Sequence, residues 1–469
     1  MNQEGRMLLE KSLIENTISY ALEKGADFAE IFVEKKFSQS IKFLDKQVDG
    51  ISSDLDYGLG LRLFLGEEIL YATTSRPTEN SLRDLVDQLI YRKTNSNLKP
   101  QSFLAQPESN SLISLNIKPW DQSLKEKINY LSDLDSFGRS VSDKVSQLQL
   151  SMNQQVQEVL IANSEGVFVE DVRPYSQVII NAVATDGGAK SQGLERKGFM
   201  MGSELFKNLD AKQMTKDAVE QAIRLLSAKN APAGKLPVIL NNGFGGVIFH
   251  EACGHGLETT SVATGASVFS GKMGEKIAHE EVTAIDNGQM QYEWGSLEFD
   301  DEGMRTQNTT LIENGVLKNY IVDKMGAIKT GYPRSGSGRR QSYHYAPASR
   351  MRNTYIAPGP HELEDMIKDV DYGLFAQKLG GGSVDTGTGA YNFAVTEGRI
   401  IRKGQLEETV KGASLIGTGF DTLSKITKVG KDLKLSPGTC GSVSGWVPVT
   451  VGQPPLLVSE ITVGGAAND

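Results

Sequence analysis

Residues 250–255 read His-Glu-Ala-Cys-Gly-His and hold two of the chain's five histidines, a glutamate and one of its two cysteines. Neutral imidazoles and thiolates are common zinc ligands, and a catalytic zinc site combines three protein ligands with one position for water. A glutamate beside a ligating histidine can take a proton from that water and pass it to a leaving amine. The stretch therefore indicates a metal site with His250 and His255 as ligands and Glu251 as the acid–base group.

The spacing of the two histidines constrains the local backbone. A regular helix turns about 100° per residue, so side chains five residues apart point about 140° away from each other and cannot bind one ion. We therefore expect either a single π-type turn or a break in the helix between His250 and His255. Gly254 and Gly256 suit either departure, because glycine tolerates unusual backbone conformations.

The motif itself does not identify the third protein ligand. Cys253 lies three residues after His250 and would share its face on a regular helix, although a free cysteine is often only a small buried apolar residue. The remote alternative is Cys440, in the glycine-flanked turn LSPGTCGSVSG. Spacing alone does not decide between the two cysteines.

The composition describes an ordinary globular chain. It has 469 residues, 39% hydrophobic and 23% charged, which is long enough for two or three domains. The net charge of −9 disfavours a sequence-independent nucleic-acid surface, because such a surface is basic. No apolar stretch approaches the length of a membrane span, and the first residues lack a signal-peptide core, so we expect no membrane contact and a cytoplasmic, reducing location.

The elements that must position the site begin with an α/β region up to residue 229. Hydrophobic periodicity predicts helices and strands in alternation, with a polar, proline-containing excursion or linker within 95–145. The predicted helices are 6–24, 80–93, 122–144 and 211–228. The predicted strands are a hairpin of 28–36 and 39–47, a pair within 57–74 that turns at residues 66–67, and 147–164, 167–185 and 197–204.

A second domain is expected from 230 to 469. Residues 229–242 carry two prolines and a glycine, which marks the boundary, and glycine-rich turns then separate many short apolar runs. This pattern predicts a β-rich domain, barrel-like or a folded-over sheet, that carries the metal site. The expected fold class is therefore α+β.

Several separated motifs in this second domain resemble those of one known family, the TldD/PmbA (TldD/TldE) metallopeptidases. The motifs are HEACGHGLE, SVFSGKMGEKIA (267–278), DDEGMRTQNTTLIENGVL (300–317), GSGRRQSYHYAPASRMRNT (336–354) and TCGSVSGWVPVTVGQPPLLVSEITVGG (439–465). The resemblance runs over most of the chain. It implies that His250 and His255 bind Zn²⁺, that Glu251 is the general acid–base, and that the third ligand is Cys440 rather than Cys253.

The resemblance also implies a substrate and partners. The three site elements are those of the catalytic TldD-type subunit, so the implied activity is hydrolysis of unfolded peptides or small unstructured proteins bound as an added strand. The implied assembly is a dimer around a central cavity, either with itself or with a sister PmbA/TldE-type subunit. The alternative function is a non-catalytic, chaperone-like peptide-binding subunit with a structural zinc, which would gain support if Cys253 closed the coordination shell.

A second group of residues has two interpretations. Arg340, Tyr343 and His344 lie in an arginine-rich stretch that could face substrate, with an arginine or His344 stabilising an oxyanion or holding a peptide carboxylate. The structural interpretation, which we favour slightly, pairs the arginines of this stretch with the acidic residues 300–302. A second cation site at those acids is the less favoured alternative.

Overall fold

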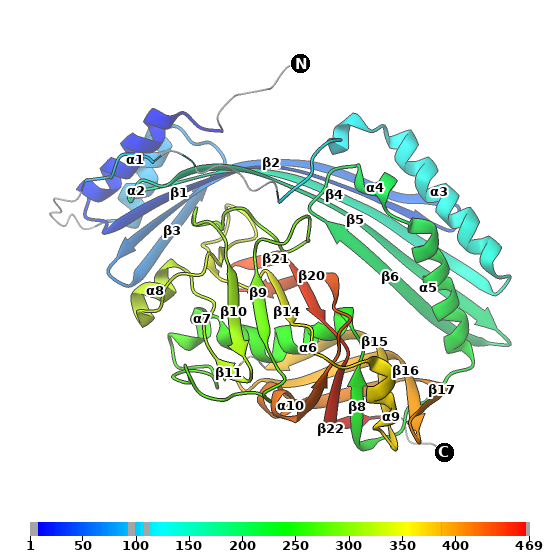
Figure 1. The fold of residues 1–469 in the computed structure, drawn as a ribbon. Helices are drawn as coiled ribbons and strands as arrows, with labels where there is room; N and C mark the ends of the chain where they lie inside the picture. Colours follow the sequence, from blue (N-terminus) through cyan, green and yellow to red (C-terminus); the bar gives the residue numbers. More distant parts are fainter. Residues whose placement is uncertain (1–7, 92–98, 105, 107–111, 386, 466–469) are drawn as a thin grey trace.

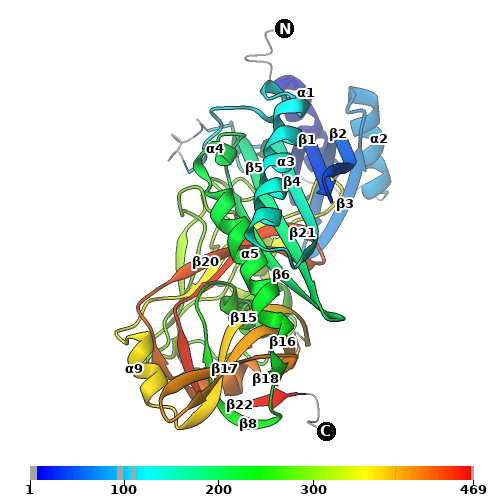
Figure 2. The same cartoon turned by 90° about the vertical axis from the view of Figure 1, so that its right-hand side faces the viewer.

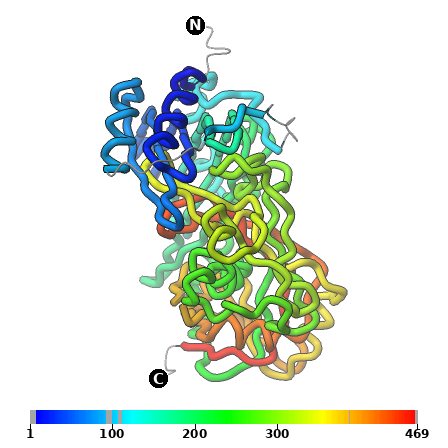
Figure 3. The backbone as a smooth tube through the Cα atoms, turned by 90° about the vertical axis from the view of Figure 1, so that its left-hand side faces the viewer, coloured from blue at the N-terminus to red at the C-terminus, as the bar shows by residue number. Residues whose placement is uncertain are grey.

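The fold is taken from a computed structural model of the full chain. It describes residues 8–91, 99–104, 106, 112–385 and 387–465, so part of the predicted linker and the ends of two predicted helices lie outside the described residues. Figure 1 shows a long curved sheet arching over a second, β-rich part, and Figure 3 shows the first, blue segments gathered at the opposite end from the orange ones. No helix of the described chain is both long enough and apolar enough to cross a membrane.

The curved sheet is antiparallel throughout, in the order β3-β2-β1-β4-β5-β6. Its strands are β1 (Phe28–Leu44), β2 (Gln47–Leu65), β3 (Glu68–Thr74), β4 (Val145–Asn163), β5 (Phe168–Asp186) and β6 (Ala189–Phe199). Side chains alternate between the two faces of a strand, and the outer face is apolar where helices cover it. The inner face meets the β-rich part.

Helices cover the outer face in two groups, one at each end of the sheet (Figures 1 and 2). The first group is α1 (Lys11–Glu23) and α2 (Glu79–Leu89); the second is α3 (Leu124–Val141) and α5 (Ala211–Leu226), with the short η1 (Pro119–Asp121) and α4 (Leu205–Asn208) nearby. Capping boxes begin α2 at Thr78 and α3 at Ser123, where each side-chain hydroxyl accepts a backbone N–H of the first turn. All four predicted helices are thus present, each slightly shorter than predicted.

Two strand predictions are wrong. The segments 28–36 and 39–47 are not the arms of a hairpin but one continuous strand, β1. The turn falls later, at Asp45 and Lys46, whose φ angles of 45° and 71° give the left-handed two-residue turn that suits a hairpin. The strand predicted at 197–204 ends at Phe199 and begins earlier, at Ala189. The polar residues 38–40 resemble a turn in the sequence, although their backbone is paired with a strand on each side.

The β-rich part contains two larger sheets. One has the order β11-β10-β9-β14-β21-β20, with strands β9 (Ala284–Asn287), β10 (Asn308–Glu313), β11 (Val316–Leu317), β14 (Asn353–Ile356), β20 (Lys434–Ser442) and β21 (Gly445–Gln453). In the other, β15, β8, β22, β18 and β16 pair in turn and β16 pairs back to β15, which closes a five-stranded barrel. The prediction of a barrel-like, β-rich domain is confirmed.

The barrel strands are β8 (Gly234–Leu240), β15 (Tyr372–Asp385), β16 (Ala390–Arg402), β18 (Ala413–Thr418) and β22 (Leu456–Gly464). Attached to them are β7 (Lys229–Asn230), β17 (Gln405–Lys411) and β19 (Ile426–Val429). The remaining elements are α7 (Thr259–Val262), α8 (Lys324–Thr330), α9 (Leu363–Lys368), α10 (Gly419–Lys425) and the small pair β12 (Gly338–Arg339) and β13 (Ala348–Ser349). The largest apolar core of this part packs around one buried helical segment, which carries the histidines.

Candidate metal centre

The buried helical segment changes its winding where the histidines lie. It consists of η2 (Gly243–Gly246), α6 (Val247–Phe249), the π-helical turn η3 (His250–Gly254) and η4 (His255–Leu257). The backbone N–H of His255 donates to the carbonyl of His250, five residues back, which is the π-helical bond. The wider turn brings the two imidazoles onto one face, with ring centroids 5.3 Å apart. Of the two departures expected from the spacing, a π-type turn or a break, the structure has the π-type turn.

The two glycines of this segment serve a different purpose from the expected one. Gly254 has ordinary helical angles, φ −57° and ψ −47°, so its backbone requires no glycine. A Cβ on Gly254 would lie 2.1 Å from the sulfur of Met351, and one on Gly256 would lie 2.9 Å from the ring of Phe269. Both positions therefore need glycine because neighbouring side chains pack against the bare backbone.

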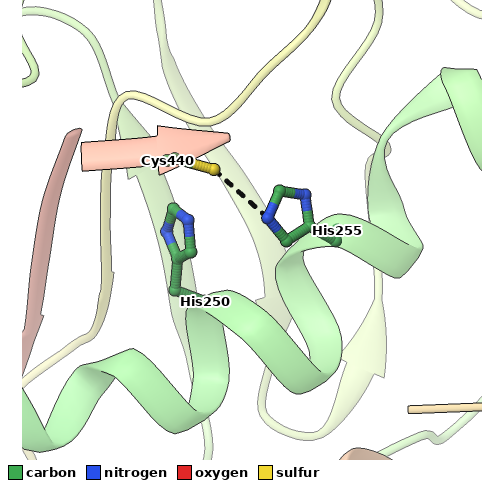
Figure 4. Close-up of side chains that lie close together, drawn as sticks. All are labelled: His250, His255 and Cys440. Carbon is green, nitrogen blue, oxygen red and sulfur yellow. Dashed lines mark hydrogen bonds between the residues drawn. The ribbon is translucent and has the colours of Figure 1, made fainter. Parts of the chain in front are cut away.

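Three side chains meet beside the π turn. Ligand atoms of His250, His255 and Cys440 all lie within 4.8 Å of one another, and all three residues are buried. Cys440 comes from β20, paired with Val447 of β21, and its Sγ is 3.2 Å from Nε2 of His255 (Figure 4). Zinc–ligand bonds of 2.0–2.3 Å in tetrahedral geometry place ligand atoms roughly 3.4–3.6 Å apart, so the group is compact enough for one ion.

The surroundings of His250 provide a second test of whether the three side chains suit a metal ion. Its ring is buried, and neither Nδ1 nor Nε2 has a hydrogen-bond partner among the described residues. Burial, the neighbouring His255 and two nearby arginines hold the pKa of His250 well below its ordinary value, so the ring is neutral. A neutral buried imidazole with two unsatisfied nitrogens costs stability unless another group uses a lone pair. The donor set of two imidazoles and a thiol suits zinc.

His255 is oriented by a carboxylate. Its Nδ1 is 2.9 Å from Oε2 of Glu258, while Oε1 of Glu258 accepts the backbone N–H of Met351. Burial opposes a charge on His255, but Glu258 and Cys440 together raise its pKa well above the ordinary value. A carboxylate that holds one ring nitrogen of a histidine fixes the tautomer and directs the other nitrogen toward a metal.

The strand that carries Cys440 is fixed by an arginine. The guanidinium of Arg350 is fully buried and donates to the carbonyl of Cys440 at 2.6 Å. It also donates to Oγ of Ser444 and to the carbonyl of Gly445, at the tip of the β20–β21 hairpin. Arg350 therefore holds both the ligand strand and its turn against the helical segment.

Glu251 lies at the more open side of the group. Its Oε2 is 3.6 Å from Nε2 of His255, and its side chain is 29% exposed, whereas that of His255 is 8% exposed. Burial raises the pKa of the Glu251 carboxyl above its ordinary value. A carboxylate with this placement can exchange a proton with a molecule that approaches the metal position.

Cys253 lies away from the cluster. It is buried in the apolar core, and its Sγ faces Gly419, where a Cβ would approach the sulfur to 2.7 Å. Burial raises the pKa of its thiol. Among the described residues the ligand group contains His250, His255 and Cys440 without Cys253, so the fourth protein ligand that a structural zinc site would require is not supplied by this residue.

The structure places Arg340, Tyr343 and His344 under the curved sheet rather than in the ligand group. Arg340 is buried and donates to Oε1 of Glu30 and to the carbonyl of Asp301. Tyr343 is buried too, its N–H donating to Glu34, while His344 is exposed and stacks on Tyr343 with ring centroids 4.0 Å apart.

The acidic residues 300–302 also lie under the curved sheet, and all three are paired with arginines. Glu302 binds Arg62 at 2.7 Å and Arg334 at 3.0 Å, and Asp301 binds Arg173. Asp300 is 3.9 Å from Arg334. The Arg334 contacts are of the kind that the structural interpretation predicts. Arg62 and Arg173 instead come from the curved sheet, and their ion pairs join the two parts of the molecule.

Two residues that support the ligands, Glu258 and Arg350, are not predicted from the sequence. Glu258 lies three residues after His255 within the motif HEACGHGLE, so its helical spacing to the histidine is the signal that could identify it. Arg350 has no such signal, because its contacts with Cys440 span 90 residues of sequence.

Two histidines and a cysteine beside a carboxylate form a donor set that suits a metal ion with an adjoining acid–base group. Models of the PmbA/TldA metallopeptidase match the chain in three successive pieces: domain 1 at residues 29–91, the central domain at 117–226 and the C-terminal domain at 233–465. The chain belongs to the PmbA/TldD metallopeptidase family.

Several curated metalloproteases match this chain over nearly its full length. A TldD homolog of Haemophilus influenzae, a metalloprotease, is 34% identical over 99% of both chains. A metalloprotease of Methanocaldococcus jannaschii is 31% identical over 92% of this chain and 96% of its own. A TldD homolog of Saccharolobus solfataricus, named a zinc metalloprotease, is 26% identical over 96% of this chain and 99% of its own. The chain is accordingly a TldD-type metallopeptidase.

Solved structures share the fold. A Thermotoga maritima protein described as a modulator of DNA gyrase superposes with a TM-score of 0.79 at 20% identity, over 97% of this chain and 100% of the other. TldE of Thermococcus kodakarensis superposes with a TM-score of 0.76 at 18% identity, again over 97% and 100%. At these identities the comparison supports the architecture described above.

Proposed function

We propose that the chain is a zinc-dependent peptidase that hydrolyses peptide bonds of unfolded peptides or small unstructured proteins. The observation that carries the proposal is the convergence of His250, His255 and Cys440 within 4.8 Å, with Oε2 of Glu251 at 3.6 Å from Nε2 of His255. The name of the Saccharolobus solfataricus relative supports zinc as the metal.

The three ligand residues would hold the ion, and its chemistry when bound is Lewis acidity toward water and toward the scissile carbonyl. Glu258 keeps His255 in the tautomer that offers Nε2, and Arg350 keeps Cys440 in place. Glu251 takes the proton of the attacking water and returns it to the leaving amine. Its raised pKa suits both steps, because a general acid–base group works best with a pKa near the operating pH.

Metal content and activity test the assignment separately. Purified protein should contain about one zinc per chain, and His250→Ala or Cys440→Ala should lose it. Glu251→Gln should retain zinc and lose hydrolysis of an unstructured peptide, because the glutamate is not among the grouped ligand residues. His361→Ala is the matched control, since this half-buried histidine pairs with Glu281 away from the cluster. Full activity of Glu251→Gln would contradict the assigned acid–base residue.

We further propose that the peptidase works as a dimer, either with a second copy or with a sister subunit of the TldE type. The shared fold with TldE of Thermococcus kodakarensis supports this assembly. We also propose that residues 1–229 and 230–469 are its two domains. Light scattering on the purified chain, alone and mixed with a sister subunit, tests the assembly, and a monomer under both conditions would contradict it.

A further inference from the structure

A cleft of about 550 Å³ lies between the last strand of the curved sheet and the β-rich part. In Figure 2 the lower part of β6 descends beside β15, and β20 passes close to them. The walls come from four segments, at residues 194–197, 241–245, 376–381 and 434–437. This volume is in the range of binding pockets for small ligands and peptide segments.

Two walls of the cleft lead directly to the metal ligands. Gly245 lies five residues before His250 on the helical segment, about 7 Å at the helical rise, and Ser436 lies four residues before Cys440, about 13 Å along a strand. Alternation along β20 puts Ser436 on the same face as Cys440, and a Cβ on Gly243 would lie 3.4 Å from the Ser436 hydroxyl. These distances correspond to about two to four residues of extended peptide between a bond at the metal position and the cleft.

The charge of the cleft contrasts with that of the whole chain. The net charge of the protein is −9, yet the cleft is lined by four basic side chains and one acidic one. These side chains are Arg196, Lys197, Lys378, Lys434 and Glu195. Apolar contact is available as well, because the lining includes Leu194, Phe244, Leu379, Leu435 and Pro437.

Most of these charges already have partners. Lys378 pairs with Glu195, Lys434 lies 3.5 Å from Asp432, and Lys197 interacts with Glu293. Arg196 differs, since within the described residues it has neither an ion pair nor a hydrogen bond. Desolvation by the surrounding protein lowers the pKa of its guanidinium, although the residue is exposed enough to meet a ligand from solvent. Arg196 therefore offers several unused donors to a ligand that enters the cleft.

We propose that this cleft is a specificity subsite that binds a carboxylate of the peptide substrate, with Arg196 as the residue that recognises it. The inference rests on the proposed peptidase function and extends it to a substrate class: unstructured peptides with an acidic side chain, or a free C-terminus, within a few residues of the cleaved bond. Arg196 gives planar, paired hydrogen bonds to a carboxylate, and the apolar wall accepts the adjoining side chains.

Binding to the Glu251→Gln holoprotein tests the subsite without hydrolysis. The probes are labelled unstructured peptides in four forms, with Glu or Gln at one internal position and with a free or an amidated C-terminus. Fluorescence anisotropy should show about twofold to fivefold tighter binding of the peptide with the recognised carboxylate, an advantage that high salt reduces. The four forms distinguish a side-chain carboxylate from a terminal one.

The advantage should disappear in the Glu251→Gln/Arg196→Gln protein and persist in Glu251→Gln/Arg83→Gln. Arg83 is an exposed arginine of α2, so its substitution makes the same charge change outside the cleft. Equal affinity for all four peptides, or an advantage that survives Arg196→Gln, would overturn the subsite. If the wild-type protein cleaves no peptide but the carboxylate preference is present, the proposed function fails and the subsite stands.

Discussion

Nδ1 of His255 and Oε2 of Glu258 are 2.9 Å apart, and this contact turns Nε2 of the same ring toward Sγ of Cys440. The carboxylate lies outside the ligand group, yet it decides which nitrogen of His255 is free to ligate. Its second oxygen accepts the N–H of Met351, so Glu258 itself is fixed in position. The geometry of the centre thus depends on a residue outside the ligand group.

Substitution of Glu258 by glutamine should weaken zinc binding about 10- to 100-fold. Without the carboxylate, neither the tautomer of His255 nor the orientation of its ring is fixed. Competition with a chromophoric chelator measures the affinity. Glu281→Gln is the control, since that acid pairs with His361 on another part of the surface and should leave zinc binding unchanged. Wild-type affinity in Glu258→Gln would show that His255 needs no carboxylate.

The two cysteines should respond differently to the same substitution. Cys253→Ser should keep about one zinc per chain and lower the free energy of unfolding by about 1–3 kcal/mol, because it buries a hydroxyl in an apolar core. Cys440→Ser should lose most of its zinc. Metal analysis and chemical denaturation of both variants provide the comparison. Zinc loss in Cys253→Ser, with the protein still folded, would place Cys253 among the ligands.

Gly254→Ala should lower the free energy of unfolding by about 1–3 kcal/mol and reduce the zinc content, because the new methyl group would overlap the sulfur of Met351. Met351→Ala in the same protein should recover part of both losses by making room. Gly50→Ala is the control, because a Cβ at that position meets no atom within 4 Å. A stable, zinc-replete Gly254→Ala protein would mean that the π turn tolerates a side chain.

Asp323 should make stability fall as the pH rises. Burial, with a smaller contribution from Glu302, raises the pKa of Asp323 from 3.8 to about 6, so the folded protein holds this proton more tightly than the unfolded chain. The stabilisation is complete below pH 4 and is lost as the pH rises through about 6. Asp323→Asn retains an N-cap for α8 and removes this dependence.

The difference between the Tm of wild type and that of Asp323→Asn, measured from pH 4 to pH 7.5, tests this prediction. The variant should gain relative stability with rising pH, up to about 3 kcal/mol for a shift of two pKa units. A relative gain by the wild type over the same range would reverse the sign and contradict the raised pKa.

The sequence predicts the helices better than the strand boundaries. The 3.6-residue periodicity that predicts α3 and α5 is a local signal, so both helices are found close to their predicted ends. The strand β1 is misread because Ser38, Gln39 and Ser40 resemble a turn, although they form a polar stretch of a long strand whose pairing is set by distant residues. Strand pairing is non-local, and single-sequence patterns do not contain it.

In the candidate metal centre, too, local features could be predicted from the sequence and non-local contacts could not. Residue spacing predicts the π turn between His250 and His255, since phasing is a local property. The choice of Cys440 over Cys253 comes from family resemblance, because Cys440 lies 185 residues from His255 along the chain and meets it only in the folded structure. The contacts of Arg350 and the cleft at Arg196 depend on tertiary packing, and neither has a pattern in the sequence.

The separation of 185 residues between His255 and Cys440 has a consequence for a cell that makes this peptidase. At ordinary translation rates the ribosome needs on the order of 10–40 s to reach the cysteine after the second histidine. During that interval the emerging chain contains both imidazoles and Glu251 but no third ligand. With the proposed ligand set, we expect a ribosome-bound or prematurely terminated chain to lack a complete metal site and to be inactive toward its own unfolded segments and those of neighbouring nascent proteins.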